Sequence, residues 1–228
     1  MKTIAVIGAL EEQINSIKSY MEIISAKNIV GLDFIMGKMC GNNVVLVRSG
    51  IGKVNAAVCT QILIDMYAVD YVINVGIAGI LNNELSMGDI VISDDICYHD
   101  FDTTCLGTSK GEIYRMDESF FKADPELIGF SLKAIEENGK NINIGRIATG
   151  DKLIIDDEAK NQIKNDFKPL CIDMESGAIA HTCELNRIPF IILCLLFEKI
   201  STNIEEIFDN TEIDSFAKIV CDIINMID

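Results

Sequence analysis

The sequence predicts an α/β protein, a three-layer sandwich whose central twisted sheet is mixed, mostly parallel and covered by helices on both faces. Strand-like and helix-like segments alternate along the chain, and the strand-like segments are continuously apolar, as in strands buried on both faces. One early pair of segments, 34–39 and 44–48, predicts a hairpin that makes the sheet mixed. Three prolines and no proline-rich linker among 228 residues indicate a single domain, 1–228.

The elements can be justified in order. The apolar run 4–9 predicts a buried strand, and Glu11-Glu12-Gln13-Ile14 predicts a helix because acidic residues favour the first turn. After the hairpin we expect a helix over 54–67 and a strand over 71–75, broken by Gly76-Ile77-Ala78-Gly79. The remaining expected strands are 89–93, 142–149 and 189–196. The remaining expected helices are 125–138, 156–166, 175–185 and 213–227, with a polar loop at 98–111.

Charge and cysteine content narrow the possible partners. Lys and Arg number 19 against 35 Asp and Glu, and this net charge of −16 repels phosphate backbones and anionic lipids. We therefore expect no nucleic-acid and no membrane partner. The eight cysteines form no CxxC pair and the chain has only two histidines, so we expect no metal and no other cofactor. Without a recognisable signal peptide, the sequence predicts a reduced, cytoplasmic protein.

Strand-to-loop junctions are the places where chemistry is expected, because open α/β sheets bind ligands beyond the carboxyl ends of their strands. Four such junctions are 8–13, 49–53, 76–79 and the segment from Glu198 onward. Their glycines let backbone N–H groups approach a ligand. Each junction taken alone is more often a plain turn, and Gly50-Ile51-Gly52-Lys53 has neither dinucleotide-binding nor Walker spacing.

The junctions and their flanks form a series of ordered blocks: IGALEE at 7–12, SGIGKVNAA at 49–57, NVGIAG at 74–79, GDIVISD at 88–94, YHD at 98–100, TGD at 149–151, DMESGAIAH at 173–181 and IPF at 188–190. Taken together and in this order, these blocks resemble the 5′-methylthioadenosine/S-adenosylhomocysteine nucleosidases of the purine/uridine phosphorylase superfamily. The resemblance implies the nucleoside phosphorylase-like fold, a small nucleoside as substrate, and a homodimer.

The resemblance also implies a ribose site at Met174 and Glu175. The methionine would lie under the sugar, and the glutamate would accept hydrogen bonds from both ribose hydroxyls, since a carboxylate offers two acceptor oxygens. Without the resemblance, Glu175 is more simply an exposed acid in the first turn of a helix. Further substrate-binding positions implied by the resemblance are Ile51, Gly79, Leu153, Ile154 and Phe208. Among these, Leu153 replaces the aromatic residue that stacks on adenine in the family.

The catalytic positions depart from the family's pattern. The glutamate that activates water aligns with Gln13, and an amide cannot accept a proton at neutral pH. The serine and the arginine that hold the water align with Ile77 and Cys194. Glu12 is the candidate substitute base, although a shift of one residue rotates a helical side chain by about 100°.

The family's acid, which protonates N7 of the leaving adenine, aligns with Glu198, a carboxylate one methylene longer. A neighbouring Phe197 would raise the pKa of such an acid by excluding water. The alternative is that Glu198 only pairs with Lys199 or with solvent.

Three functions remain open. The first is an N-ribosyl hydrolase that cleaves the base from methylthioadenosine, S-adenosylhomocysteine or a related nucleoside. The second is a catalytically impaired nucleoside-binding protein, which the joint change of Gln13, Ile77 and Cys194 favours. The third, a nucleoside phosphorylase, requires cations around phosphate; Arg48 and Lys53 are present, but the late-strand arginine is replaced by cysteine.

Overall fold

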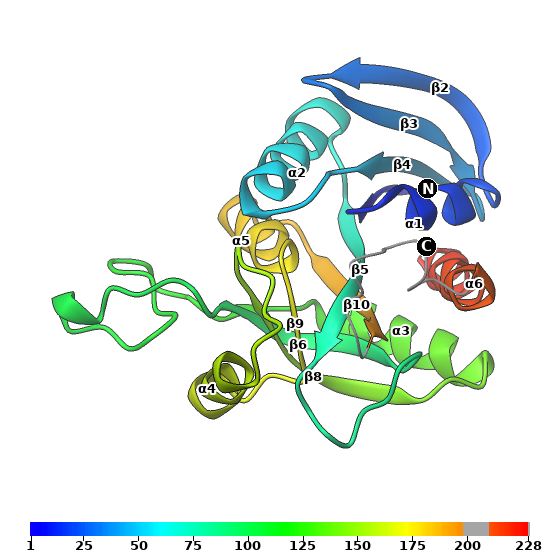
Figure 1. Cartoon of the computed structure of the whole chain (residues 1–228). Helices are drawn as coiled ribbons and strands as arrows, with labels where there is room; N and C mark the ends of the chain where they lie inside the picture. Colours follow the sequence, from blue (N-terminus) through cyan, green and yellow to red (C-terminus); the bar gives the residue numbers. More distant parts are fainter. Residues whose placement is uncertain (198–209, 228) are drawn as a thin grey trace.

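The computed structural model describes residues 1–197 and 210–227, and Figure 1 shows how strands and helices alternate along them. The strands are β1 (Thr3–Gly8), β2 (Glu22–Ile29), β3 (Leu32–Met39), β4 (Asn42–Arg48), β5 (Tyr71–Ile80), β6 (Ile90–Tyr98), β7 (Phe121–Lys122), β8 (Ile142–Thr149), β9 (Cys171–Asp173) and β10 (Phe190–Phe197). The helices are α1 (Glu11–Lys18), α2 (Lys53–Tyr67), the 3₁₀ turn η1 (Thr104–Leu106), α3 (Pro125–Glu137), α4 (Asp157–Phe167), α5 (Ser176–Asn186) and α6 (Asn210–Met226). The predicted α/β class with a mixed, helix-flanked sheet is confirmed.

The sheet combines a ring with an open wing. Its strand order is β10-β6-β8-β9-β5-β1-β4-β3-β2, and β10 also pairs with β5. Because β5 pairs with both β9 and β10, strands β5, β9, β8, β6 and β10 close into a ring, and β1, β4, β3 and β2 extend from it. The parallel strands β4, β1, β5 and β10 bring their carboxyl ends to one edge, as expected for a ligand site.

The glycines of 76–79 do not break β5, contrary to the prediction. The strand runs through them to Ile80, because Gly76–Gly79 pairs residue by residue with Cys194–Phe197 of β10. The neighbouring strand satisfies the backbone groups that a turn would otherwise leave for other partners. The same lengthening lets the end of β5 reach β9.

Strand β2 and the short strands β7 and β9 were not predicted. β2 is an edge strand that pairs only with β3 among the described residues, and its side chains are mostly exposed. An exposed edge strand carries no apolar periodicity for a sequence pattern to detect. β7 and β9 have two and three residues, too few to form a pattern.

Helices cover both sides of the sheet. α2 packs against α5, and α6 packs against α1 and α3; Figure 1 shows these two groups on opposite sides of β5 and β10. The start of α3 is fixed by Asp124, whose side chain accepts hydrogen bonds from two backbone N–H groups, with Pro125 in the first turn. No helix within the described ranges is long and apolar enough to cross a membrane.

Candidate functional site

The edge formed by the carboxyl ends of the parallel strands holds a bond between two distant loops. The backbone N–H of Gly52, just before α2, donates a hydrogen bond of 2.7 Å to Oε1 of Glu175, just before α5. Gly52 has a φ of +96°, and a Cβ atom there would lie 3.2 Å from Oδ1 of Asp151. Only glycine adopts this conformation without strain, so the residue type at position 52 allows the bond to Glu175 to form.

Burial controls the charge of Glu175. Its removal from water, with the carboxyl group of Asp173 as the second cause, raises the pKa of Glu175 to about 7, while the N–H groups of Gly52 and Met174 oppose the shift. Near neutral pH the group therefore exists in both protonation states. As a carboxylate it has two oxygens, each able to accept two hydrogen bonds, and Gly52 uses one of these acceptor sites. The remaining acceptor sites of Glu175 would suit two adjacent hydroxyl groups.

Asp173 is fixed from two directions. Oγ1 of Thr149 on β8 donates to Oδ1 of Asp173 at 2.6 Å, and the backbone N–H of Ser176 donates to Oδ2 at 3.0 Å. Burial raises the pKa of Asp173, and these hydrogen bonds oppose the shift. Because Asp173 lies two residues before Glu175, these bonds also fix the approach of the chain to α5.

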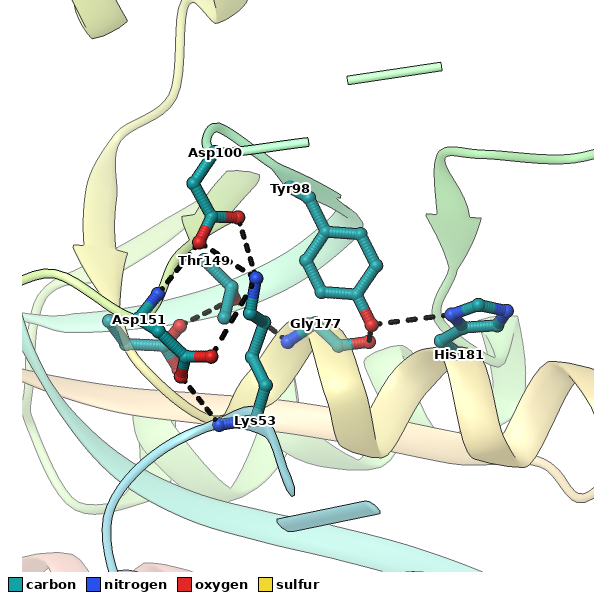
Figure 2. A network of polar contacts seen from close by, with 8 residues as sticks. Lys53, Tyr98, Asp100, Thr149, Asp151, Gly177 and His181 are labelled. Carbon is teal, nitrogen blue, oxygen red and sulfur yellow. Dashed lines mark hydrogen bonds and ion pairs between the residues drawn. The ribbon is translucent and has the colours of Figure 1, made fainter. Parts of the chain in front are cut away.

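Lys53 ties three loops together, as Figure 2 shows. Its backbone N–H donates to Oδ1 of Asp151 at 2.8 Å, and its Nζ donates to both oxygens of Asp100 at 2.8 and 2.7 Å. The backbone N–H of Asp151 donates to Asp100 at 2.9 Å, which closes the network. The loops after β4, β6 and β8 are therefore held together, and Gly52, the neighbour of Lys53, is held facing Glu175.

A second branch of the network fixes the first turns of α5. The hydroxyl of Tyr98 donates to the carbonyl of Gly177 at 3.0 Å and lies 3.3 Å from Nδ1 of His181 (Figure 2). The N–H of Gly177 donates to Oγ1 of Thr149 at 2.8 Å. A Cβ at Gly177 would come within 2.8 Å of both Thr149 and Tyr98, so the close approach of α5 to the sheet requires glycine.

Gln13 is a structural residue of the first turn of α1. It is buried, and its Oε1 accepts hydrogen bonds from the backbone N–H groups of Ala9 at 3.1 Å and Leu10 at 3.0 Å. Its Nε2 is buried without a hydrogen-bond partner among the described residues. The neighbouring Glu12 is partly exposed on the same turn. The side-chain oxygen of Gln13 therefore satisfies backbone donors and is not directed to a ligand.

The side chains at the ends of β5 and β10 are apolar or uncharged. Cys194 is fully buried, and its Sγ lies 3.4 Å from where a Cβ on Gly76 would be. A hydrogen bond with Cys171, together with burial, raises the pKa of Cys194 well above its ordinary value, so the thiol stays neutral. Ile77 is partly buried on β5. This part of the site offers no charged group from positions 13, 77 or 194.

Comparison with known proteins agrees with this geometry. The sequence model of the phosphorylase superfamily matches residues 3–225. The 5′-methylthioadenosine/S-adenosylhomocysteine nucleosidase of Staphylococcus epidermidis is 35% identical over 217 residues, which cover 93% of this chain and 95% of the relative. The chain belongs to the methylthioadenosine/S-adenosylhomocysteine nucleosidase family. The enzyme of the same name from Bacillus cytotoxicus is 38% identical over 83% of each chain.

Solved structures support the same family. The nucleosidase from Neisseria meningitidis, in complex with methylthio-immucillin-A, superimposes with a TM-score of 0.93 at 34% identity and covers 99% of both chains. The S-adenosylhomocysteine nucleosidase from Streptococcus pyogenes, in complex with 5-methylthiotubericidin, gives a TM-score of 0.91 at 26% identity and covers 100% of this chain and 98% of that one. The resemblance and the fold predicted from the sequence blocks are thus confirmed.

The structure brings three of the family-implied residues together. Met174 directly precedes Glu175 and is partly buried. Ile51 directly precedes Gly52, which is bonded to Glu175, and the side chain of Ile51 is mostly exposed. The hydrogen bond between Gly52 and Glu175 therefore brings these three positions to one place, although Ile51 and Glu175 lie 124 positions apart in the chain.

Leu153, Ile154 and Gly79 lie on neighbouring elements. The loop that carries Leu153 and Ile154 begins at Asp151, which binds the backbone of Lys53. Leu153 is exposed, whereas Ile154 is buried and lines a cavity of about 320 Å³ between the loop after β6 and α4. Gly79 lies inside β5, between Ile172 of β9 and Phe197 of β10. Glu198 and Phe208 lie outside the described residues.

The sequence analysis singled out Glu175 but missed the residues that hold it. Asp100, Thr149 and Asp151 stood in the matching blocks without an assigned role, and Lys53 was considered only as a cation for phosphate. Their only signal was position, because each lies at the carboxyl end of a strand or in the segment that follows it. The hydrogen bonds among Lys53, Asp100 and Asp151 link positions 47 to 98 residues apart, which no local pattern encodes.

Proposed function

We propose that this chain is a single-domain, cytoplasmic N-ribosyl hydrolase that releases the base from methylthioadenosine, S-adenosylhomocysteine or a related nucleoside. The observation that carries the proposal is the partly buried carboxyl group of Glu175, held by Gly52 at 2.7 Å in a chain that belongs to this nucleosidase family. The relatives are named for that activity, and the solved neighbours hold nucleoside analogues.

The proposed mechanism divides the work between two ends of the site. Glu175, as a carboxylate, accepts hydrogen bonds from the two ribose hydroxyls while Met174 contacts the sugar. Glu198 protonates the leaving base, and Glu12 is the proposed base that accepts the proton of water. Gln13, Ile77 and Cys194 do not assist that water, so we expect hydrolysis to be slow.

A second candidate function is nucleoside binding without turnover. The specific observation in its favour is that the oxygen of Gln13 already accepts two backbone hydrogen bonds, while Cys194 is a buried neutral thiol. Loss of general-base catalysis alone lowers a rate by about 10²–10⁴-fold. A phosphorylase is less well supported, because Lys53 pairs with Asp100 and Arg48 pairs with Glu11 at 3.3 Å. Both cations considered for phosphate are therefore paired with carboxylates.

The proposed enzyme acts as a homodimer. Val54 and Val58 lie one turn apart on α2 and are 74% and 44% exposed, and Leu106 in the loop after β6 is 56% exposed. Burial of these apolar side chains against a second copy would remove them from water. Light scattering at micromolar concentration should give twice the mass of one chain. A monomer would contradict the proposed interface.

Product analysis tests the proposal directly. The purified protein is incubated with methylthioadenosine, S-adenosylhomocysteine and 5′-deoxyadenosine in separate samples, with and without phosphate, and free base is measured by chromatography. Release of base without phosphate supports the hydrolase. Release only with phosphate would indicate a phosphorylase, and binding without release would indicate the second candidate.

A further inference from the structure

Two cysteines far apart in sequence lie side by side at the surface. The Sγ atoms of Cys40 and Cys221 are 3.4 Å apart, although 181 positions separate them in the chain. Cys40 is exposed in the turn between β3 and β4, and Cys221 is partly buried on α6. Both are free thiols. A disulfide requires about 2.05 Å between the sulfurs, so the two groups already lie near bonding distance.

The surrounding contacts hold the two thiols together. Asn42, two residues after Cys40, is buried, and its Nδ2 donates to the carbonyls of Ile224 at 3.3 Å and Ile227 at 2.8 Å. The thiol of Cys40 also contacts the carbonyl of Cys221 at 3.7 Å. The hairpin is therefore attached to the C-terminal end of α6 next to the pair, which limits the freedom of the two sulfurs to separate.

The backbone does not explain a cysteine at position 40. Cys40 and Gly41 form the two-residue turn, with φ values of +50° and +83°. Such turns favour asparagine followed by glycine, because asparagine adopts the left-handed conformation more readily than most residues. The contacts of Cys40 that reach beyond the turn are those of its thiol with Cys221.

Other cysteines of the chain differ from this pair in exposure or in the presence of a neighbouring thiol. Cys171 and Cys194 also lie close enough to interact, but both are fully buried, where a dissolved oxidant has no access. Cys105 is exposed and has no cysteine partner among the described residues. Cys40 and Cys221 combine exposure of one sulfur with the proximity of a second.

We infer that Cys40 and Cys221 form an oxidation site that takes a hydroperoxide as oxidant and closes to an intrachain disulfide. The sulfur of exposed Cys40 attacks hydrogen peroxide, the O–O bond breaks, and a sulfenic acid and one water form. The sulfur of Cys221 then attacks the sulfur of Cys40: the S–S bond forms, the S–O bond breaks, and the hydroxyl leaves with the proton of Cys221 as a second water. Two thiols are oxidised, and one peroxide is reduced to two waters.

The order of the steps follows from exposure. Burial, together with the adjacent thiol of Cys40, raises the pKa of Cys221 to about 12, so Cys221 stays protonated and reacts slowly with peroxide. Cys40 reacts first because solvent reaches it. Cys221 then acts on the sulfenic acid beside it.

Peptide mapping of the full chain tests the inference. The protein is treated with a small molar excess of hydrogen peroxide, the remaining thiols are alkylated, and tryptic peptides are analysed by mass spectrometry. Trypsin places Cys40 in peptide 39–48 and Cys221 in peptide 219–228. We expect these two peptides to be linked, with the mass of two hydrogens lost, and to separate after treatment with dithiothreitol.

Three variants make the result specific. Cys40→Asn keeps the preferred turn chemistry and Cys221→Ala removes the second sulfur, and each should abolish the link. Cys105→Ser, the matched exposed cysteine, should leave it unchanged. Sulfinic acid on Cys40 beside an unmodified Cys221, a disulfide between two chains, or no oxidation of Cys40 would each overturn the inference.

Discussion

At the Glu175 end of the site, a partly buried carboxyl group accepts a hydrogen bond from the backbone of a distant loop, whereas at the Gln13 end the side-chain oxygen accepts hydrogen bonds from the backbone of its own turn. Glu175 keeps free acceptor capacity and a pKa of about 7. Oε1 of Gln13 accepts hydrogen bonds from the backbone N–H groups of Ala9 and Leu10, and Cys194 is a neutral buried thiol. The contrast teaches that ribose recognition and water activation are separable: we propose that Glu175 serves the first and that the second is impaired.

The largest effect is expected from restoring the family's water-handling residues at the Gln13 end of the site. Together, Gln13→Glu, Ile77→Ser and Cys194→Arg should raise adenine release by about 10²-fold or more over the best single change. Groups that act as a unit are non-additive, so each single substitution recovers little. The measurement is the initial rate of adenine formation. Asp173 and Glu175 lie within electrostatic range of position 194, so a guanidinium there would meet carboxylates.

The melting temperature of the triple variant serves as its folding control, since position 194 is fully buried. A parent protein that hydrolyses nucleosides as fast as its relatives would contradict the contrast. In that outcome Glu12, or another acid, already activates the water.

The next largest effect is expected at the ribose end. Glu175→Gln should weaken nucleoside binding about 10- to 100-fold, because a charge-assisted hydrogen bond contributes about 1.5–3 kcal/mol. The affinity for free adenine should stay nearly constant, since adenine has no ribose hydroxyls. Calorimetric titration measures both affinities. Glu184→Gln, an exposed acid on α5, the helix that follows Glu175, is the matched control. Equal nucleoside affinity of Glu175→Gln and parent would make Glu175 a merely structural acid.

The raised pKa of Glu175 gives a smaller, pH-dependent effect. Nucleoside affinity should rise about tenfold between pH 6 and pH 8, as Glu175 ionises near pH 7 and becomes an acceptor for both hydroxyls. In Glu175→Gln this pH dependence should disappear. An unchanged profile in the variant would assign the titration to another group.

The free energy of unfolding should change with pH in the opposite direction to the nucleoside affinity. The folded-state pKa of Glu175 lies above its ordinary value, so its contribution to stability is full below about pH 4.5 and is lost as the pH rises through about 7. As the pH rises from 5 to 8, the melting temperature should therefore fall less in Glu175→Gln than in the parent.

The smallest effect is expected from loosening the loop that carries Gly52. Lys53→Met removes the bond to Asp100 and should weaken nucleoside binding about three- to fivefold, since a partly exposed ion pair contributes little by itself. Lys140→Met removes an ion pair of the same 2.7 Å length and similar exposure on another part of the surface. Comparing Lys53→Met with Lys140→Met separates the positioning of the loop from the general loss of a positive charge. A similar loss of nucleoside affinity in both variants would mean that Lys53 has no role in positioning Gly52.

The sequence by itself determined the class of the fold and the family, and it predicted the ribose residue. Continuous apolar segments that alternate with helices are sufficient to predict a buried α/β sheet, because the side chains of each strand show whether both of its faces are buried. Ordered blocks such as 49–57 and 173–181 were sufficient for the family, and they placed Met174 and Glu175 in it. The sequence also showed that positions 13, 77 and 194 hold no acid, hydroxyl or guanidinium group.

Tertiary structure decided the remaining features, because they depend on contacts between distant segments. Gly76–Gly79 stays in a strand only because β10 pairs with it, and the ring closes only because β5 is long enough to reach β9. The pKa of Glu175 depends on burial and on Asp173, and its geometry depends on Gly52, 123 residues away. The proximity of Cys40 and Cys221 also depends on a contact between distant segments, because the β3–β4 turn packs against α6. No local pattern encodes such distances, since the register of a sheet and the packing of helices on it fix them only after folding.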